Sequence, residues 1–302
     1  MLRSRLDHWL TRAAAELDVP GLRFIDTASG KVRVLDSGTS AGSCVVMVPD
    51  GPNLIEHHAE VSRLLTHKGY RVVCFDMPGF GFSRPSASHM HSLDQGAEVI
   101  RTVLDALSIE RATLAFSCAN GFYALKLAQA SPERIASLFL SQTPSLPAMH
   151  AWTRRTVPWL LRVPVMGQLV GWLFRAKMTS AWYRISLPKG NDGKALRPLA
   201  ASALAAGGCF CLAGVVQGLT RESAASLQGV SAPCTVVWGS ADRSHRLTSA
   251  LSMRECVPHA QVVLFEDCGH FPDLEQPQRY VRLLTEHLTD LAFRRKVAAT
   301  AS

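Results

Sequence analysis

The sequence predicts an α/β fold in which a mostly parallel sheet is flanked by helices on both faces. Short, largely apolar runs at 45–48, 72–75 and 234–238 recur along the chain, and helical patterns separate them. Strands buried on both faces of a parallel sheet are apolar throughout, and alternation of strands with helices is typical of such sheets. At 302 residues and 47% hydrophobic content, the chain is long enough for one such core with an insertion.

The most informative segment is I109-E-R-A-T-L-A-F-S-C-A-N-G-F-Y-A-L-K-L-A128. It predicts a short strand, a sharp turn and a helix, an arrangement that exposes a nucleophile at the end of a sheet. If the nucleophile is Ser117, alanines stand two positions away on both sides, which suits the crowded turn. If it is Cys118, the same positions hold Phe116 and Asn120, which suits the turn less well.

Two later segments supply an acid and a histidine. P233-C-T-V-V-W-G-S-A-D242 is an apolar strand that ends in W-G-x-x-D, and V262-V-L-F-E-D-C-G-H270 is a strand and glycine turn that ends in His270. A histidine beside a thiol takes its proton, and an aspartate fixes the histidine's tautomer and stabilises the imidazolium. The pattern therefore predicts a catalytic triad in the order nucleophile, Asp242, His270.

Together these segments resemble the α/β-hydrolase superfamily over about residues 30–290, most closely its lidded esterase and haloalkane-dehalogenase-like branch. In that family the run I-E-R-x-x-L-V-G-H-S has nine steps from isoleucine to nucleophile, and nine steps from Ile109 reach Cys118. A P-E-R-[VI] turn often follows the nucleophile by fourteen residues, and Pro132 stands at that distance from Cys118. The resemblance implies Cys118 as the nucleophile, with Ser117 as the alternative.

Some residues depart from the family pattern. Phe116 has no counterpart there, whereas Asn120 stands where glycine is usual and is tolerable because asparagine adopts the left-handed region readily. A buried structural cysteine on a degenerate elbow is the other reading of Cys118. Dehalogenases and epoxide hydrolases of this fold attack with an aspartate, and neither position 117 nor 118 is one, so those two chemistries are disfavoured.

The loop P49-D50-G51-P52 stands where the family usually has H-G-x-P. This match gives the backbone N–H of Gly51 to an oxyanion hole, together with the N–H of Ala119. The shifted match would place Pro52 at the donor position, and proline has no N–H. An ordinary Pro/Gly turn is the alternative interpretation of this loop.

No pattern predicts a metal or an organic cofactor. The glycine-rich run D76-M-P-G-F-G-F-S83 lacks the G-x-G-x-x-G spacing of dinucleotide sites and favours a structural turn. The eight cysteines show neither a disulfide rhythm nor zinc-like spacing, which favours reduced thiols in a cytoplasmic protein.

Two regions lie outside the strand rhythm. Residues 145–228 are helical and apolar and predict a cap, inserted before the acid strand into a core formed by 1–144 and 229–302. The N-terminal segment has Leu2, Leu6, Trp9 and Leu10 at helical spacing, which favours a helix packed on the body, with contact to a membrane surface as the alternative. Neither region has a clean apolar run that predicts a transmembrane segment or a secretory signal.

The sequence predicts an enzyme that hydrolyses a hydrophobic ester, thioester or lactone through an acyl-enzyme. A close alternative is an acyltransferase or cyclase that passes the acyl group to a nucleophile other than water, and a third is a non-catalytic ligand-binding relative. The formal net charge of +8 suits solubility, an acidic acyl-carrier protein, a coenzyme A thioester or an anionic membrane surface. No basic-aromatic module indicates nucleic-acid binding.

Overall fold

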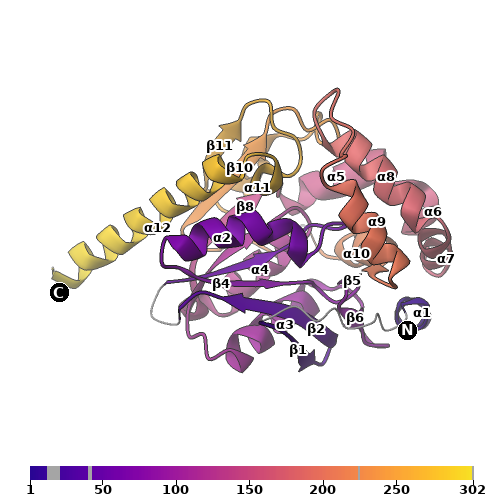
Figure 1. Cartoon of the computed structure of the whole chain (residues 1–302), viewed down its shortest axis with the longest axis horizontal. Coiled ribbons are helices and arrows are strands. Elements are labelled where there is room, and N and C mark those ends of the chain that lie inside the picture. The colour runs from indigo at the N-terminus through magenta and orange to yellow at the C-terminus, as the bar shows by residue number, and fades with distance from the viewer. Residues whose placement is uncertain (12–20, 40–42, 224, 301–302) are drawn as a thin grey trace.

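The computed structural model describes residues 1–11, 21–39, 43–223 and 225–300, with side chains as far as residue 291 (Figure 1). Its main sheet consists of β1 (Leu22–Thr27), β2 (Gly30–Ser37), β3 (Cys44–Val48), β4 (Arg71–Phe75), β6 (Arg84–Pro85), β7 (Ala112–Phe116), β8 (Ile135–Ser141), β10 (Cys234–Gly239) and β11 (Gln261–Phe265). The spatial order is β1-β2-β4-β3-β7-β8-β10-β11, and β6 pairs with β2. In this spatial order the six strands β4, β3, β7, β8, β10 and β11 pair in parallel with their neighbours. The pairs β1–β2, β2–β4 and β2–β6 are antiparallel. The predicted mostly parallel sheet is confirmed.

Helices cover both faces of this sheet because alternate residues of each strand point to opposite sides. In β3, Val46 and Val48 belong to the core that includes α3 (Leu93–Ala106) and α4 (Asn120–Ala130). Val45 and Met47 belong to the core that includes α2 (Ala59–His67) and α12 (Pro277–Thr300). The sheet thus holds a buried apolar layer on each side, and the site residues extend from its carboxyl edge.

Between β8 and β10 the chain forms a group of helices that we call the cap helices. They are α5 (Leu146–Thr156), α6 (Trp159–Arg162), α7 (Met166–Leu173), α8 (Arg175–Ser186), α9 (Arg197–Ala205) and α10 (Leu212–Leu219). A short antiparallel pair, β5 (Phe80–Gly81) with β9 (Cys209–Phe210), joins them to the core. Figure 1 shows these helices gathered at the end of the molecule opposite the C-terminus. The division into a cap at 145–228 and a core stays a prediction.

Shorter helical elements complete the chain: η1 (Ile55–His58), η2 (Pro132–Arg134), η3 (Ala250–Glu255) and α11 (Pro272–Glu275). The glycine-rich run after β4 is a turn, and a Cβ on Gly81 would lie 2.2 Å from the Asp76 carboxylate. That carboxylate accepts hydrogen bonds from the backbone N–H groups of Ile55 and Phe82. The run therefore serves a structural purpose, as its spacing predicts.

The N-terminal helix α1 (Leu2–Leu10) forms, but it is turned differently from the prediction. Leu2 and Trp9 are 61% and 72% exposed, whereas Arg3 and Asp7 are buried. The expectation that its apolar residues pack on the body is therefore wrong for Leu2 and Trp9. The helix docks through polar groups instead. Among the described residues no helix is long and apolar enough to cross a membrane.

Candidate active site

The predicted elbow lies at the carboxyl end of β7. Cys118 has φ +49°, a backbone conformation that is uncommon for a residue with a side chain. The turn is held by two hydrogen bonds: the Cys118 N–H donates to the Ser141 carbonyl at 2.8 Å, and the Thr143 hydroxyl donates to the Cys118 carbonyl at 3.1 Å. Helix α4 begins two residues later. Strained backbone of this kind concentrates at functional sites.

The two residues that depart from the usual elbow pattern each have a structural explanation. Phe116 ends β7 inside the core, and its ring packs edge-on against Phe75 with 6.1 Å between centroids. Asn120 is not in the left-handed region, so the reason expected for its presence is wrong. Its side-chain amide instead donates to the Pro49 carbonyl at 2.9 Å, which ties the elbow to the loop after β3.

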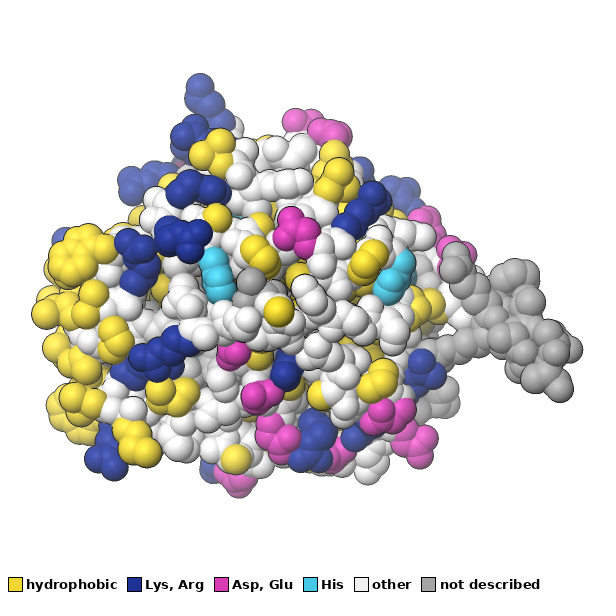
Figure 2. All heavy atoms as spheres, turned by 180° about the vertical axis from the view of Figure 1, so that it is seen from behind, with side chains coloured by type: hydrophobic (Ala, Val, Ile, Leu, Met, Phe, Trp, Pro, Cys, Tyr) yellow, Lys and Arg dark blue, Asp and Glu magenta, His cyan; other side chains and the backbone are white. Residues whose placement is uncertain are grey.

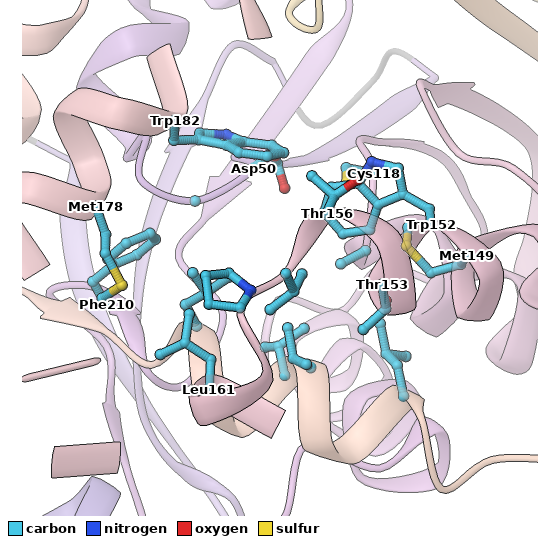
Figure 3. Close-up of a pocket in the computed structure, with 18 of the residues that line it drawn as sticks. Asp50, Cys118, Met149, Trp152, Thr153, Thr156, Leu161, Met178, Trp182 and Phe210 are labelled. Atoms are coloured by element: carbon cyan, nitrogen blue, oxygen red, sulfur yellow. The ribbon is translucent and has the colours of Figure 1, made fainter. Parts of the chain in front are cut away.

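Of the two nucleophile candidates, Cys118 lines a cavity and Ser117 does not. Ser117 is 3% exposed and pairs with Ser141 as an extension of the sheet. Cys118 is also buried from bulk water, but its side chain forms part of the cavity wall in Figure 3. The geometry thus favours the thiol over the neighbouring hydroxyl.

Asp242 and His270 lie together as the sequence predicts. His270 Nδ1 is 2.7 Å from Asp242 Oδ2, and this oxygen also accepts from the Gln142 side-chain amide at 2.5 Å. The other oxygen accepts from the N–H of Ser244 at 2.8 Å. Burial by itself raises the pKa of Asp242, but the neighbouring His270 overcomes this and brings that pKa to about 2. The aspartate is therefore ionised and fixes one face of the imidazole.

The other ring nitrogen of His270 is directed towards two groups. Nε2 has no hydrogen-bond partner among the described residues, and it lies 3.3 Å from Asp50 Oδ2 without the angle of a hydrogen bond. A ring nitrogen of His270 also lies within 4.8 Å of the Cys118 sulfur. Burial alone lowers the pKa of His270, but Asp242, the thiolate form of Cys118 and Asp50 together raise it well above its ordinary value. Neutral His270 is therefore a strong proton acceptor.

Asp50 is a site residue that sequence reasoning did not assign. It is 7% exposed and lines the cavity, and its Oδ2 has no hydrogen-bond partner among the described side chains and backbone. Burial raises the pKa of this carboxyl, although His270 opposes the shift. The one available signal was a charged residue in the loop directly after a fully apolar strand.

The thiol of Cys118 is neutral at rest. Burial, followed by the charge on Asp50, raises its pKa to about 11. A thiolate is the reactive form of cysteine, so any attack by this sulfur would require the loss of its proton. The neighbouring His270 is the group placed to receive it.

His245 is a second residue that the sequence did not indicate. Its ring stacks on Trp152 with 4.9 Å between centroids and an interplanar angle of 2°, and on His270 at 5.2 Å and 24°. Neither ring nitrogen has a hydrogen-bond partner within the described structure. Burial, followed by the charge on His270, lowers the pKa of His245 to about 3, so the ring is neutral. No sequence motif marks a residue that acts through stacking.

Cys118, His245 and His270 each offer a ligand atom within 4.8 Å of the other two, which is close enough to share a cation. The Asp242 contact leaves only Nε2 of His270 available for such a role. Cys118 and His270 are also the two residues that the sequence predicts as nucleophile and base, and these roles stay predictions.

The predicted oxyanion donors lie beside the nucleophile. Gly51 and Ala119 both line the cavity that Cys118 faces. In the described part of the chain, neither backbone N–H donates to an oxygen acceptor. The Ala119 N–H points to the Cys118 sulfur. Two amides without an oxygen acceptor beside a candidate nucleophile are what an oxyanion hole requires. Their role stays a prediction.

The cavity above Cys118 has a volume of about 300 Å³ and is almost entirely apolar (Figure 3). Trp182 lies over Asp50 at one side, and Trp152 and Met149 lie near Cys118. The wall also includes Phe80, Val157, Leu161, Met178, Ile185, Phe210, Leu212, Val215, Val216 and Leu219. Asp50 is the charged residue among the lining side chains, and none is a lysine or an arginine.

The sequence model of the alpha/beta hydrolase fold family matches residues 46–277 of this chain, which include the elbow, the acid and the histidine. The chain belongs to the α/β-hydrolase family. It resembles the 2-hydroxy-6-oxononadienedioate/2-hydroxy-6-oxononatrienedioate hydrolase of Cupriavidus pinatubonensis, with 26% identity over 88% of this chain and 94% of that protein. It also resembles the 2-hydroxymuconate semialdehyde hydrolase of Pseudomonas putida, with 28% identity over 73% and 77%.

Solved structures agree with this assignment of the fold. Epoxide Hydrolase A from Mycobacterium thermoresistibile superposes with a TM-score of 0.75 at 16% identity, covering 90% of this α/β-hydrolase and 98% of that chain. A thermophilic esterase from Thermogutta terrifontis superposes with a TM-score of 0.68 at 20% identity, covering 89% and 98%. The family and its relatives are hydrolases, and this protein is an enzyme of that fold class.

Proposed function

We propose that this α/β-hydrolase cleaves an apolar ester, thioester or lactone through a thioester acyl-enzyme on Cys118. The observation that carries the proposal is the position of the Cys118 thiol, between the His270–Asp242 pair and the floor of an apolar cavity. A nucleophile, an oriented base and a closed apolar acyl site are what acyl transfer needs.

In the first half-reaction the Cys118 sulfur attacks the substrate carbonyl while its proton passes to Nε2 of His270. The carbonyl oxygen becomes an oxyanion, which the N–H groups of Gly51 and Ala119 stabilise. The tetrahedral intermediate then breaks its bond to the alcohol or thiol, which leaves with the proton from His270. The products of this half are the free alcohol or thiol and a thioester on Cys118.

In the second half-reaction a water molecule gives its proton to His270 and attacks the thioester. The bond between the carbonyl carbon and the Cys118 sulfur breaks, and the sulfur recovers the proton. Asp242 remains ionised throughout and stabilises the imidazolium in both halves. The acid product leaves, and the resting thiol is restored.

The protonation state of Asp50 affects both halves. An ionised Asp50 beside Cys118 repels a developing oxyanion, whereas a protonated one does not and is able to donate a hydrogen bond. Its raised pKa, caused by burial, favours the protonated form. Asp50 and His270, which lie 3.3 Å apart, therefore compete for a proton.

The lining of the cavity favours an apolar acyl group. A dioate such as the one in the name of the Cupriavidus relative would bring two carboxylates into a wall that has no lysine or arginine. A buried charge without a partner is strongly unfavourable. We therefore expect neutral, hydrophobic substrates.

The relatives favour a second candidate, the hydrolysis of a carbon–carbon bond. The 2-hydroxy-6-oxo compounds in their names carry a ketone and no ester, so their cleavage breaks a bond between carbons. In this protein the same cavity would accept a 1,5-diketone whose ends are apolar rather than ionised.

Turnover of a substrate panel separates these candidates. The panel contains p-nitrophenyl esters and acyl thioesters of increasing chain length, an apolar 1,5-diketone and its dicarboxylate counterpart, each with and without an added alcohol or amine. Preference for the esters or thioesters supports the proposal, and preference for either diketone overturns it. Product acyl esters or amides formed with the added nucleophile would indicate a transferase instead of a hydrolase.

A cavity variant shows whether the measured activity comes from this site. Trp182→Ala removes an indole from the wall while leaving Cys118 in place. It should shift the preferred acyl chain towards greater length. We expect kcat/KM to rise about fourfold for each added CH₂ that becomes buried, which corresponds to ~0.8 kcal/mol. An unchanged chain-length preference would place the acyl group elsewhere.

A further inference from the structure

The described residues expose their large hydrophobic side chains very unevenly. Of the fourteen such side chains that are exposed, ten belong to α1, α6, α7 and the residues adjoining them. We call these ten the cap-edge patch: Met1, Leu2, Trp9, Trp159, Val163, Met166, Leu169, Trp172, Leu173 and Phe174. Figure 2 shows hydrophobic side chains gathered along the edge of the molecule at the left of that view, with lysines and arginines near them.

The patch is continuous across helices that are distant in the sequence. Helix α1 contacts α7 and α10, and α7 contacts α6 and α8. Trp9 of α1 lines the same surface cavity as Leu169 and Trp172 of α7. The exposed apolar residues therefore form one surface instead of scattered single positions, and surfaces of this kind mark interaction sites.

Helix α7 shows that this exposure is built into the fold. Its inner face consists of Gly167, Gln168 and Gly171, whereas Met166, Leu169, Trp172 and Leu173 point outward. A helix on the surface of a globular protein normally turns its apolar stripe inward. A Cβ on Gly167 would lie 2.5 Å from the Leu161 carbonyl oxygen, so the inner face is fitted for small residues.

Helix α1 is turned in the same way, and polar bonds hold it. Gln168 donates to Asp7 Oδ2 at 3.4 Å, and Arg3 donates to Gln217 Oε1 at 3.3 Å. Trp9 stays 72% exposed beside α7. Two adjacent helices thus bury polar side chains and expose apolar ones, which is the reverse of the arrangement that the hydrophobic effect favours in water.

The surrounding charge identifies the partner. From residue 135 to residue 191 the chain has seven lysines and arginines and no aspartate or glutamate, so this segment carries seven of the net eight positive charges. Two of these cations lie over exposed aromatic rings of the patch: Arg175 is 5.3 Å from the Trp172 ring centroid, and Lys177 is 5.7 Å from that of Phe174. Exposed aromatic and aliphatic residues bordered by cations are typical of helices that lie on anionic lipid.

We propose that the cap-edge patch docks this protein on the surface of an anionic phospholipid bilayer. The active-site cavity is close to the patch, since Leu161 of α6 lines it together with Met178 of α8, the helix that follows Phe174. Docking would therefore hold the cavity near the acyl phase, where apolar substrates dissolve. The binding itself does not depend on the proposed chemistry.

Co-sedimentation with lipid vesicles tests the proposal without turnover. The protein is mixed with vesicles of phosphatidylcholine and with vesicles in which phosphatidylglycerol makes up about one third of the lipid. We expect the partition coefficient to be about tenfold higher or more on the anionic vesicles, and to fall as salt is added. The fluorescence of the exposed Trp9, Trp159 and Trp172 should shift to the blue on binding.

Matched pairs of variants locate the surface. Trp159→Ser with Leu173→Ser should lower partitioning about tenfold or more, whereas Leu251→Ser with Leu264→Ser, which are 54% and 49% exposed outside the patch, should not. Arg175→Glu with Lys177→Glu should weaken binding far more than Lys31→Glu with Lys68→Glu, which changes the net charge equally.

Three outcomes would overturn the proposal. The first is wild-type protein that stays in solution with both kinds of vesicle. The second is binding that the control pairs reduce as much as the patch pairs do. The third is a protein that does not bind vesicles but self-associates in analytical ultracentrifugation, with Trp159→Ser and Leu173→Ser together abolishing the self-association. That result would make the patch an interface between two copies of the chain. A protein that binds vesicles but turns over no ester would refute the proposed function alone.

Discussion

Replacement of Asp50 by asparagine tests how the charges around His270 control the reaction. His270 must be neutral to accept the thiol proton, and its pKa is raised well above the ordinary value. The neutral form exists only above that pKa, so kcat/KM must fall as the pH falls through it. Asp50→Asn removes one negative charge that favours the imidazolium, and the acid limb of the pH profile should therefore move to lower pH.

The distance between the two groups sets the size of this effect. Unit charges 3.3 Å apart interact by about 5 kcal/mol at an effective dielectric constant of ~20. Burial raises the pKa of Asp50 and keeps part of this carboxyl protonated, so only a fraction of that energy is available. We expect kcat/KM on the acid limb to rise about tenfold, which corresponds to ~1.4 kcal/mol.

The assay is kcat/KM for the best ester of the panel, measured from acidic to alkaline pH for the wild type and Asp50→Asn. Asp273→Asn is the control, because Asp273 is also buried but lies 2.7 Å from His58 and is not part of the cavity wall around Cys118. Thermal melting shows that each variant is folded. Coincident acid limbs for the wild type and Asp50→Asn would refute the idea that Asp50 holds the proton on His270.

Two further predictions concern how the elbow and the acid are held. Gly121→Ala should lower the free energy of unfolding by about 1–3 kcal/mol, because the added Cβ would lie 2.3 Å from Thr143 Oγ1. Gly171→Ala should raise the free energy of unfolding by ~0.5–1 kcal/mol, because no atom lies nearer than 3.9 Å to its added Cβ. Urea unfolding compares the two variants, and equal effects would contradict the packing argument. Gln142→Leu removes the amide that donates to Asp242 and the oxygen that accepts from the Gly239 N–H. We therefore expect kcat to fall about tenfold or more with little change in KM. An unaffected kcat would show that Gln142 does not position the acid.

The sheet and the elbow follow from local patterns, which is why the sequence predicts them. Strands β3, β7 and β10 are buried along their whole length, and each is an apolar run in the sequence with at most one threonine in it. The acid follows β10 and the histidine follows β11, its parallel neighbour, so their meeting at one edge of the sheet is a consequence of parallel topology.

Asp50 and His245 could not be predicted in the same way. Their importance depends on their positions relative to His270. Asp50 Oδ2 lies 3.3 Å from its Nε2, and the ring centroid of His245 lies 5.2 Å from that of His270. No local spacing encodes a contact between chain segments so far apart. In the sequence Asp50 is one position of a loop, and no recognised motif contains His245.

The orientation of α1 and α7 was missed for a related reason. Helical periodicity shows that apolar residues share one face, but it does not show which face the rest of the molecule covers. The polar bonds of Asp7 and Gln168, and the close approach at Gly167, turn the apolar faces outward. This orientation depends on tertiary contacts and carries the inference about the membrane surface.

Intact mass spectrometry with peptide mapping tests the central claim most directly. Wild type, Cys118→Ala and Ser117→Ala are exposed briefly to p-nitrophenyl esters and acyl thioesters, and any adduct is mapped. The account predicts one acyl group on Cys118 in the wild type and in Ser117→Ala, and none in Cys118→Ala. An acyl group on Ser117, or turnover that survives in Cys118→Ala, would contradict the thiol mechanism.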